Sequence, residues 1–286
     1  MGGLAQVPQL PVGRLGCSDT VPLRSSTVLD FTPATATRPA LALSQVSLAF
    51  GSDHRVLERV DLDIARGEFV TLVGPSGCGK STVLRLMAGL LQPTSGQVEL
   101  PDDPRIALVF QEPNLLPWRT VQENIALPLE LLGVDPAETN RRVRESLELI
   151  GFETGDVQKR PRELSGGMRM RVSLARALVT EPDVLLLDEP FAALDDLLRE
   201  QLNEELLAIH SARGTTAMFV THNVSEAVFL SDRVVVMPAV AGGNFSEVAV
   251  GFPRPRTASL RAEADFAGLG GEVSARLRRG GREESS

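Results

Sequence analysis

The feature that most constrains the fold of this chain is a glycine-rich segment, GPSGCGKST at 74–82. It follows the short apolar run FVTLV at 69–73, which predicts a buried strand, and it precedes apolar residues at helical spacing, Val83, Leu86, Met87 and Leu90. Glycines allow backbone conformations that turn successive N–H groups toward phosphate oxygens at the start of a helix. The complete GxxxxGKS pattern between a strand and a helix therefore predicts a phosphate-binding loop rather than a glycine-rich turn with a stray lysine.

The polar side chains of this loop have predicted roles. Lys80 supplies a cation for the β and γ phosphates, Ser81 offers a hydroxyl as a magnesium ligand, and Thr82 reaches the α phosphate. Cys78 is interpreted as a small loop residue, and a redox role is the weaker alternative. The remaining predicted nucleotide-binding residues of the loop are Gly74, Pro75, Ser76, Gly77, Cys78 and Gly79.

A second segment, VLLLDEP at 184–190, predicts a buried strand that ends in two carboxylates. In an open α/β sheet, the carboxyl ends of the strands form the edge at which ligands bind. Asp188 is predicted to hold Mg²⁺ through water, and Glu189 to accept a proton from the attacking water. A solvated acidic turn is the alternative, and the phosphate-binding loop upstream favours the catalytic interpretation.

A third segment, LSGG at 164–167, places two glycines at the start of a predicted helix. Each glycine inside a helix costs about 1 kcal/mol relative to alanine, so another group is expected to approach this backbone closely. A helix start that carries the Ser165 hydroxyl and no obstructing side chain suits an anion. Ser165, Gly166 and Gly167 are therefore predicted to form a second phosphate-facing site, with a simple helix N-cap as the alternative.

The composition argues against several classes of protein. Lys and Arg number 29 against 37 Asp and Glu, and the resulting net charge of -8 would repel the phosphate backbone of nucleic acid. Two cysteines, Cys17 and Cys78, are too few for a disulfide framework or a zinc cluster and suit a reducing cytoplasm. No apolar run reaches the roughly 18 residues of a membrane-spanning helix, and the N-terminus lacks a secretory pattern.

The pattern along the chain predicts an α/β fold with appendages. Residues 1–40 are rich in Pro, Thr, Ser, Gly and Ala and are predicted to be a disordered leader. Strands and helices alternate over 41–256, which predicts one sheet-based domain, with a helical subdomain at about 112–165. Residues 257–286 are predicted to be a partly helical tail, whose helix over 258–279 is interrupted by glycines.

Four segments, GPSGCGKST, LSGGMRMRVSLARAL, VLLLDEPFAALD and FVTHNVSEA, together resemble the ATP-binding subunits of ABC transporters over roughly residues 41–255. The resemblance implies a P-loop NTPase sheet with an antiparallel β subdomain and an inserted helical subdomain. It implies ATP hydrolysis with ATP and Mg²⁺ bound. It also implies two copies arranged head to tail, each nucleotide lying between the phosphate loop of one copy and the SGG segment of the other.

The resemblance assigns roles to residues whose chemistry alone is ambiguous. Gln111 matches the glutamine that touches magnesium and water, and His222 matches the histidine that contacts the γ phosphate and orients Glu189. Asp195 matches a residue of the loop through which paired subunits communicate, and Phe50 stands where the family usually has a tyrosine on adenine. The alternatives are a polar strand end for Gln111, a structural histidine for His222, a helix cap for Asp195 and core packing for Phe50.

His54 and His210 carry no such support and are interpreted as surface residues. Trp118, the chain's only tryptophan, follows Gln111 in the string LLPWRTV, where a permease would dock in the family. An exposed apolar anchor beside Arg119 is one interpretation of Trp118, and a core residue is the other.

Within the family, the string QEPNLLPWRTVQENIALPLE, the SGGM variant and PRPR at 253–256 look like importer subunits of the nitrate, sulfonate and taurine group. This resemblance implies membrane permease subunits and, indirectly, a solute-binding protein as partners, at the cytoplasmic face of the inner membrane. Importers of thiamine-precursor pyrimidines are an alternative. So is a soluble, non-transport ABC ATPase, which the lack of sustained heptads between Lys80 and Ser165 disfavours.

Overall fold

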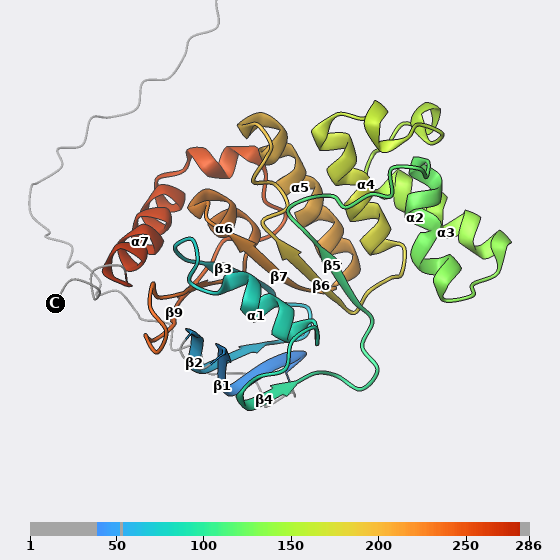
Figure 1. Ribbon diagram of the computed structural model, residues 1–286. Coiled ribbons are helices and arrows are strands. Elements are labelled where there is room, and N and C mark those ends of the chain that lie inside the picture. Colours follow the sequence, from blue (N-terminus) through green and yellow to red (C-terminus); the bar gives the residue numbers. More distant parts are fainter. Residues whose placement is uncertain (1–38, 52–53, 281–286) are drawn as a thin grey trace, which may run out of the picture. The chain divides into compact units, whose positions relative to one another are not determined.

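The computed structural model describes residues 39–51 and 54–280 of the chain. Most of the predicted leader, 1–40, and the end of the predicted tail, 281–286, lie outside the described residues. The described part contains a six-stranded sheet and a three-stranded sheet, with helices packed against them (Figure 1). The mixed α/β architecture with an antiparallel β subdomain is therefore confirmed.

The large sheet carries its strands in an order that differs from their order in the chain. The pairs β5–β6, β6–β7, β7–β3 and β3–β8 are parallel, and β9 pairs with β8 in antiparallel fashion. Parallel sheets are covered on both faces, which explains the nearly continuous apolar sequence of the central strands. Across the sheet the strands are β5 (Ile106–Val109), β6 (Val184–Asp188), β7 (Thr216–Thr221), β3 (Phe69–Val73), β8 (Arg233–Val236) and β9 (Ser246–Ala249).

Side chains of each strand alternate between two hydrophobic cores. In β3, Val70 and Leu72 face one core while Phe69 and Val73 face the other. The first core is closed by α1 (Lys80–Met87) and by the antiparallel small sheet of β1 (Leu41–Phe50), β2 (His54–Ile64) and β4 (Ser95–Glu99), which lies at the bottom of Figure 1. The glycine-rich loop, which leads from β3 into α1, therefore lies beside this core, to which its Cys78 belongs.

The helix α1 is shorter than its apolar spacing predicts. It ends at Met87, and Leu90, predicted on the same face, lies beyond the helix end and is exposed. The reason is local: Gly89 takes a positive φ of 69°, a conformation that stops a helix.

Four of the helices that contribute to the second core lie along the opposite face of the large sheet. These are α4 (Gly166–Leu178), α5 (Asp196–Arg213), α6 (Val224–Leu230) and α7 (Ala264–Gly280). Phe219 of β7 lies between Phe69 and Phe191, with ring centroids 6.3 and 5.9 Å away. Because α5 and α6 follow β6 and β7 directly along the chain, their packing determines how the loops at those strand ends are held.

The segment between β5 and β6 is largely helical. It contains α2 (Val121–Leu131) and α3 (Pro136–Leu149), followed by the 3-10 turns η1 (Thr154–Asp156) and η2 (Pro161–Glu163). Thr120 and Glu123 form a reciprocal capping box at the start of α2, and Asp135 caps α3 with Pro136 in its first turn. Figure 1 shows α2 and α3, in green, beside α4.

The C-terminal part contains the short turn η3 (Ala258–Ala262) and then α7. The predicted interruption by glycines is wrong, because α7 runs unbroken through Gly268, Gly270 and Gly271. Buried Phe266 and Val273 anchor this helix to the second core, and that tertiary packing outweighs the low helix propensity of glycine.

One histidine departs from its predicted location. His54 is exposed as expected, but His210 is only 5% exposed, on the inner face of α5. Its ring lies edge-on to Phe69 with centroids 5.0 Å apart, and its Nδ1 is 2.7 Å from Nη1 of Arg254. No helix within the described residues is long and apolar enough to span a bilayer.

Candidate active site

Four groups of the predicted site residues follow the carboxyl ends of strands that lie side by side in the sheet order β5, β6, β7 and β3. Gln111 comes two positions after β5, Asp188 ends β6, His222 follows β7, and the glycine-rich loop follows β3. Because these strands are parallel, their carboxyl ends share one edge. The strand order thus brings together segments that are far apart in the sequence.

The glycine-rich loop ends in a backbone conformation that favours glycine. Gly79, the residue before α1, has φ 101°, and a Cβ at this position would stand 3.0 Å from Val56 Cγ1. Lys80, 6% exposed, turns back over the loop, and its Nζ donates to the carbonyl oxygens of Gly74 at 2.9 Å and Pro75 at 2.8 Å. Its ammonium is therefore fixed within the loop that is predicted to hold phosphate.

The loop and the strand β6 meet through a direct hydrogen bond. Ser81 Oγ donates to Asp188 Oδ1 at 2.9 Å. Burial raises the pKa of the Asp188 carboxyl, an effect that this hydrogen bond opposes and the neighbouring Glu189 charge reinforces. A partly buried carboxylate beside a hydroxyl would gain from a nearby cation, and both groups are the hard oxygen ligands that Mg²⁺ prefers.

Glu189 has an unusual backbone and a defined partner. Its φ is 47°, in the left-handed region that residues with a side chain seldom adopt, and its N–H donates to Val220 O at 2.9 Å. One carboxylate oxygen, Oε2, lies 3.0 Å from Nδ1 of His222, and the other, Oε1, lies 4.0 Å from Nζ of Lys80. The strained backbone aims the carboxylate at two groups of the same edge, a feature that concentrates at functional sites.

A cleft of about 490 Å³ gathers most of these side chains. It extends from the glycine-rich loop to Phe50, an aromatic side chain that is exposed rather than packed in the core. His54 and Val56 also line it, and sequence reasoning did not select either as a site residue. The signal that could have found them is strand pairing, because His54 is the cross-strand partner of Phe50 in β1–β2. The cleft is lined by Phe50, His54, Val56, Ser76, Gly77, Gly79, Lys80, Ser81, Thr82, Gln111, Asp188 and Glu189.

The remaining residues of the glycine-rich loop do not line the cleft with their own atoms. Gly74 and Pro75 instead supply the carbonyls that hold Lys80. Cys78 is buried, and burial raises the pKa of its thiol, which keeps the sulfur in its less reactive protonated form. This environment agrees with a packing role for Cys78.

The SGG segment is absent from the lining of this cleft. Ser165 caps α4, its Oγ accepting from the Met168 N–H at 3.2 Å. At Gly167 the close neighbour is the Leu198 side chain of α5, so this glycine makes room for packing within the chain. At the exposed Gly166, a Cβ would meet no atom closer than Leu194 Cδ2 at 3.7 Å, so this helix start is open.

Asp195 also lies outside the cleft lining. It caps α5, and its Oδ1 accepts from the Leu198 N–H at 3.0 Å. The capping role that was the alternative for both Ser165 and Asp195 is thus present in the structure, and it is compatible with a further role toward another molecule.

Trp118 is 67% exposed, so the core interpretation of this residue is wrong. It precedes Arg119, which pairs with Glu130 of α2 at 2.7 Å. The tryptophan therefore stands on the surface of the segment that joins Gln111 to the helical insert.

Comparisons with known proteins agree with this geometry. A family model for the ABC transporter matches residues 57–192. The aliphatic sulfonates import ATP-binding protein SsuB of Rhodopseudomonas palustris is 44% identical over 265 residues, covering 90% of this chain and 90% of the relative. The nitrate import ATP-binding protein NrtD of Synechococcus elongatus is 44% identical over 230 residues, covering 73% of this chain and 84% of the relative.

Among solved structures, a dimeric ATP-binding cassette in a post-hydrolysis state bound to ADP and Pi superposes with a TM-score of 0.66. It is 31% identical in sequence, and the match covers 74% of this chain and 100% of that chain. With motifs, fold and sequence in agreement, the chain belongs to the ABC transporter family, as one of its ATP-binding and ATP-hydrolysing subunits.

Proposed function

We propose that this chain energises the import of small oxyanion-type solutes, and that its turnover uses the cleft at the carboxyl edge of the large sheet. The observation that carries the proposal is the contact between the Glu189 carboxylate and His222, next to a cleft lined by the phosphate loop, Asp188 and Gln111. A base, a cation and phosphate-binding N–H groups then share one place, which is what hydrolysis of a phosphoanhydride requires.

The chemical step that follows is water attack on the γ phosphate. A bond forms between the water oxygen and the γ phosphorus while the bond to the β–γ bridging oxygen breaks, and Glu189 takes the water proton. His222 holds the Glu189 carboxylate through its contact at 3.0 Å, so the carboxylate keeps its direction as the proton moves. Lys80 neutralises charge on the departing phosphates, and Gln111 at the cleft wall orients the water.

The residues present fit a magnesium ion. Asp188 and Ser81 would hold it with Gln111, supplying a carboxylate, a hydroxyl and an amide oxygen. The described residues contain no group of three or more His, Cys, Asp or Glu that would cage a metal. The Asp188 carboxylate with the Ser81 hydroxyl suits Mg²⁺, which proteins commonly bind through one or two carboxylates together with substrate phosphates. When bound, the ion would neutralise phosphate charge.

A second copy of the chain would complete the site. Ser165 and Gly166 form an open helix start that does not reach the cleft of their own chain, and the related cassette solved with ADP and Pi is a dimer. In a head-to-tail pair, this helix start of one copy would face the phosphate loop of the other, with Asp195 close to the contact.

The names of the relatives support an assignment of the partners and the solute. Two relatives at 44% identity are named for the import of nitrate and of aliphatic sulfonates. We therefore assign membrane permease subunits as the direct partner, a solute-binding protein as an indirect one, and the cytoplasmic face of the cell membrane as the place of action. Isolating the native membrane complex and identifying the bound solute tests this assignment. A bound thiamine-precursor pyrimidine, or a ribosomal partner with no permease, would refute it.

The catalytic assignment has its own test in Glu189→Gln. This variant keeps the size of the side chain and one acceptor oxygen but loses the base, so ATP should still bind while turnover falls by roughly 10²-fold or more. The matched control is Glu181→Gln, an exposed glutamate that precedes β6 at the opposite edge of the sheet. Brisk turnover in Glu189→Gln would refute the assigned base.

A further inference from the structure

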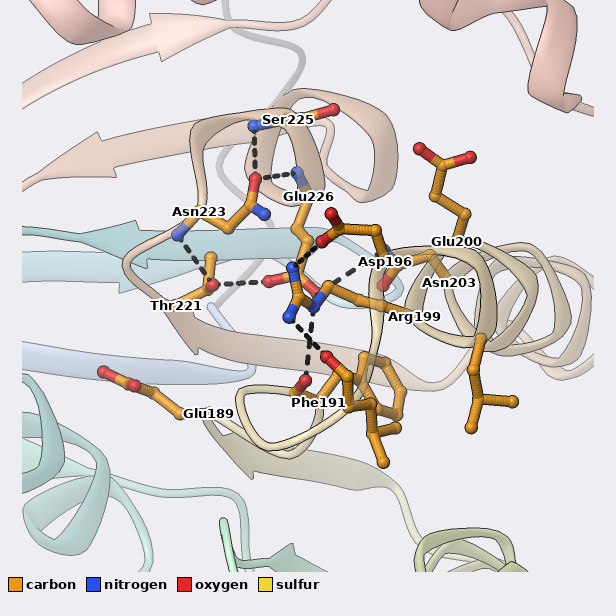
Figure 2. A network of polar contacts seen from close by, with 12 residues as sticks. Glu189, Phe191, Asp196, Arg199, Glu200, Asn203, Thr221, Asn223, Ser225 and Glu226 are labelled. Atoms are coloured by element: carbon orange, nitrogen blue, oxygen red, sulfur yellow. Dashed lines mark hydrogen bonds and ion pairs between the residues drawn. The ribbon is translucent and has the colours of Figure 1, made fainter. Parts of the chain in front are cut away.

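The loop that follows Glu189 is held by one arginine from the next helix. Arg199, in the first turns of α5, donates through Nε to the Phe191 carbonyl at 3.3 Å and through Nη2 to the Leu194 carbonyl at 2.6 Å. Its Nη1 pairs with Asp196 at 2.8 Å. Figure 2 shows this guanidinium between the loop below it and α6 above it. A planar guanidinium with several fixed donors can set the loop's conformation in a way that a single contact cannot.

A buried carboxylate lies on the other side of this arginine. Glu226 of α6 is 5% exposed, and its Oε1 is 4.0 Å from Arg199 Nε. Thr221 Oγ1 donates to Glu226 Oε2 at 2.5 Å, and Asn203 Nδ2 donates to Oε1 at 3.5 Å. Burial raises the pKa of Glu226, while these donors and Arg199 act in the opposite direction. An almost fully buried carboxylate needs such partners to stay charged.

The contacts of Glu226 lead directly to His222. Thr221 precedes His222 and Asn223 follows it, and the Asn223 N–H donates to the same Thr221 Oγ1 at 3.0 Å. The Asn223 side chain in turn caps α6 at Ser225 and Glu226 (Figure 2). The backbone on both sides of His222 is thereby tied to Glu226.

These contacts close a ring around the catalytic pair. The series of contacts starts at the loop after Glu189, which Arg199 holds, and continues from Arg199 to Glu226 and from Glu226 to Thr221. Thr221 precedes His222, whose Nδ1 lies 3.0 Å from the Glu189 carboxylate. Neither Arg199 nor Glu226 lines the nucleotide cleft. Resting on the function proposed above, we infer that Arg199 and Glu226 are positioning residues, which fix the Glu189 loop and the His222 segment relative to each other for hydrolysis.

The alternative is a buried ion pair that only joins α5 to α6. The two possibilities differ in what they predict for turnover at an occupied site. A purely structural pair would change the fraction of folded protein, whereas a positioning pair changes kcat per bound ATP with little effect on ATP affinity, because the phosphate loop is untouched.

The test measures steady-state kcat and KM, ATP binding stoichiometry and the urea unfolding midpoint for the full chain. Arg199→Gln is expected to lower kcat per bound ATP by about tenfold or more, with ATP affinity within about threefold of wild type. Arg199→Lys, which keeps the charge but lacks the fork, is expected to recover part of the loss.

The matched control is Arg233→Gln. Arg233 is about as exposed as Arg199 and also makes an ion pair with a glutamate, Glu68 at 2.8 Å, but it lies at the amino end of β8. Its variant is expected to lose stability and keep kcat per bound ATP within about twofold. The inference is overturned if Arg199→Gln behaves in the same way, or if its ATP affinity falls in parallel with kcat.

If Arg199→Gln does not fold, Glu226 decides the question. Glu226→Gln keeps an acceptor for Thr221 and should lose only about three- to fivefold in kcat per bound ATP, while Glu226→Ala should lose more than tenfold. Equal turnover in both variants and wild type would overturn the inference. Failure of the proposed function is distinguishable, because Glu189→Gln would then hydrolyse ATP like wild type whatever the Arg199 variants do.

Discussion

His222 Nδ1 lies 3.0 Å from Glu189 Oε2, a contact that joins the carboxyl ends of the neighbouring strands β7 and β6. Glu189 reaches it from a left-handed backbone with φ 47°. The carboxylate is thus directed by two separate features, a strained main chain and a side-chain partner. This arrangement is the basis of the first prediction.

Replacing His222 by alanine should lower kcat by roughly 10²-fold, because the Glu189 carboxylate loses the group that holds it. ATP binding should change little, since Lys80 and the glycine-rich loop are intact. Steady-state ATPase assays together with nucleotide titration measure both quantities. Unchanged turnover in His222→Ala would contradict the role given to the 3.0 Å contact.

Two inactive variants should restore activity when mixed. Lys80→Ala removes the ammonium group that is proposed to contact the phosphates, and Ser165→Arg blocks the open helix start, so neither variant alone has a complete site. A head-to-tail heterodimer of the two would contain one intact Lys80 opposite one intact Ser165. Mixing should therefore recover up to about one quarter of wild-type activity, since half of the pairs are mixed and each has one working site. No recovery in a mixture shown to form heterodimers would contradict completion of the site in trans.

Trp118 should matter for the membrane partner and not for ATP binding. At 67% exposure it offers a large apolar side chain to a docking surface. Trp118→Ala should weaken association with the permease by about 2 kcal/mol or more, the magnitude of an interface hot spot. Co-purification of the complex measures association, and ATPase activity of the free subunit serves as the control. Undiminished assembly with the permease would show that Trp118 lies outside the interface.

His210 should make stability depend on pH. Burial, with the nearby Arg254 cation, lowers the pKa of His210 to about 4, below its ordinary value of 6.5. Between these values the unfolded chain binds a proton that the folded chain does not, so the free energy of unfolding should fall as pH drops from about 6.5 to about 4. Its full contribution, present above pH 6.5, is at most about 3.5 kcal/mol.

The matched variant is His210→Gln, which keeps an acceptor for the Arg254 guanidinium and removes the titration. Urea unfolding midpoints at several pH values should show a shallower loss of stability toward low pH in this variant than in wild type. Identical slopes would mean that His210 takes up its proton equally well in both states.

Much of the fold was predictable from short segments of sequence. The strand, loop and helix around Gly79 and Lys80 are contiguous, so glycine placement and apolar spacing were enough to predict them. The same holds for β6, whose apolar run delivers Asp188 and Glu189 to its carboxyl end. Local patterns predicted less well where packing competes with propensity, as in the unbroken helix α7.

The side-chain environments outside the motifs required the tertiary structure. Whether Trp118 was exposed or in the core was left open by its neighbours, and His210 looked like a surface residue. The burial of His210 depends on how α5 packs against the sheet at Phe69 and on the C-terminal segment, where Arg254 lies beside His210 although 44 positions separate them. His54 lines the cleft because it pairs with Phe50 across two strands, and no sequence motif indicates that pairing.

The sequence by itself determined the glycine-rich loop, the strand that ends in carboxylates and the alternation of strands and helices that builds an α/β sheet. Each of these depends on patterns among residues that are close together in the sequence. The family resemblance implied that His222 orients Glu189, but only the tertiary structure gave their contact and decided that Arg199 and Glu226 tie their loops together. The physical reason is that these contacts depend on strand order and on the packing of α5 against α6, and no local spacing encodes either.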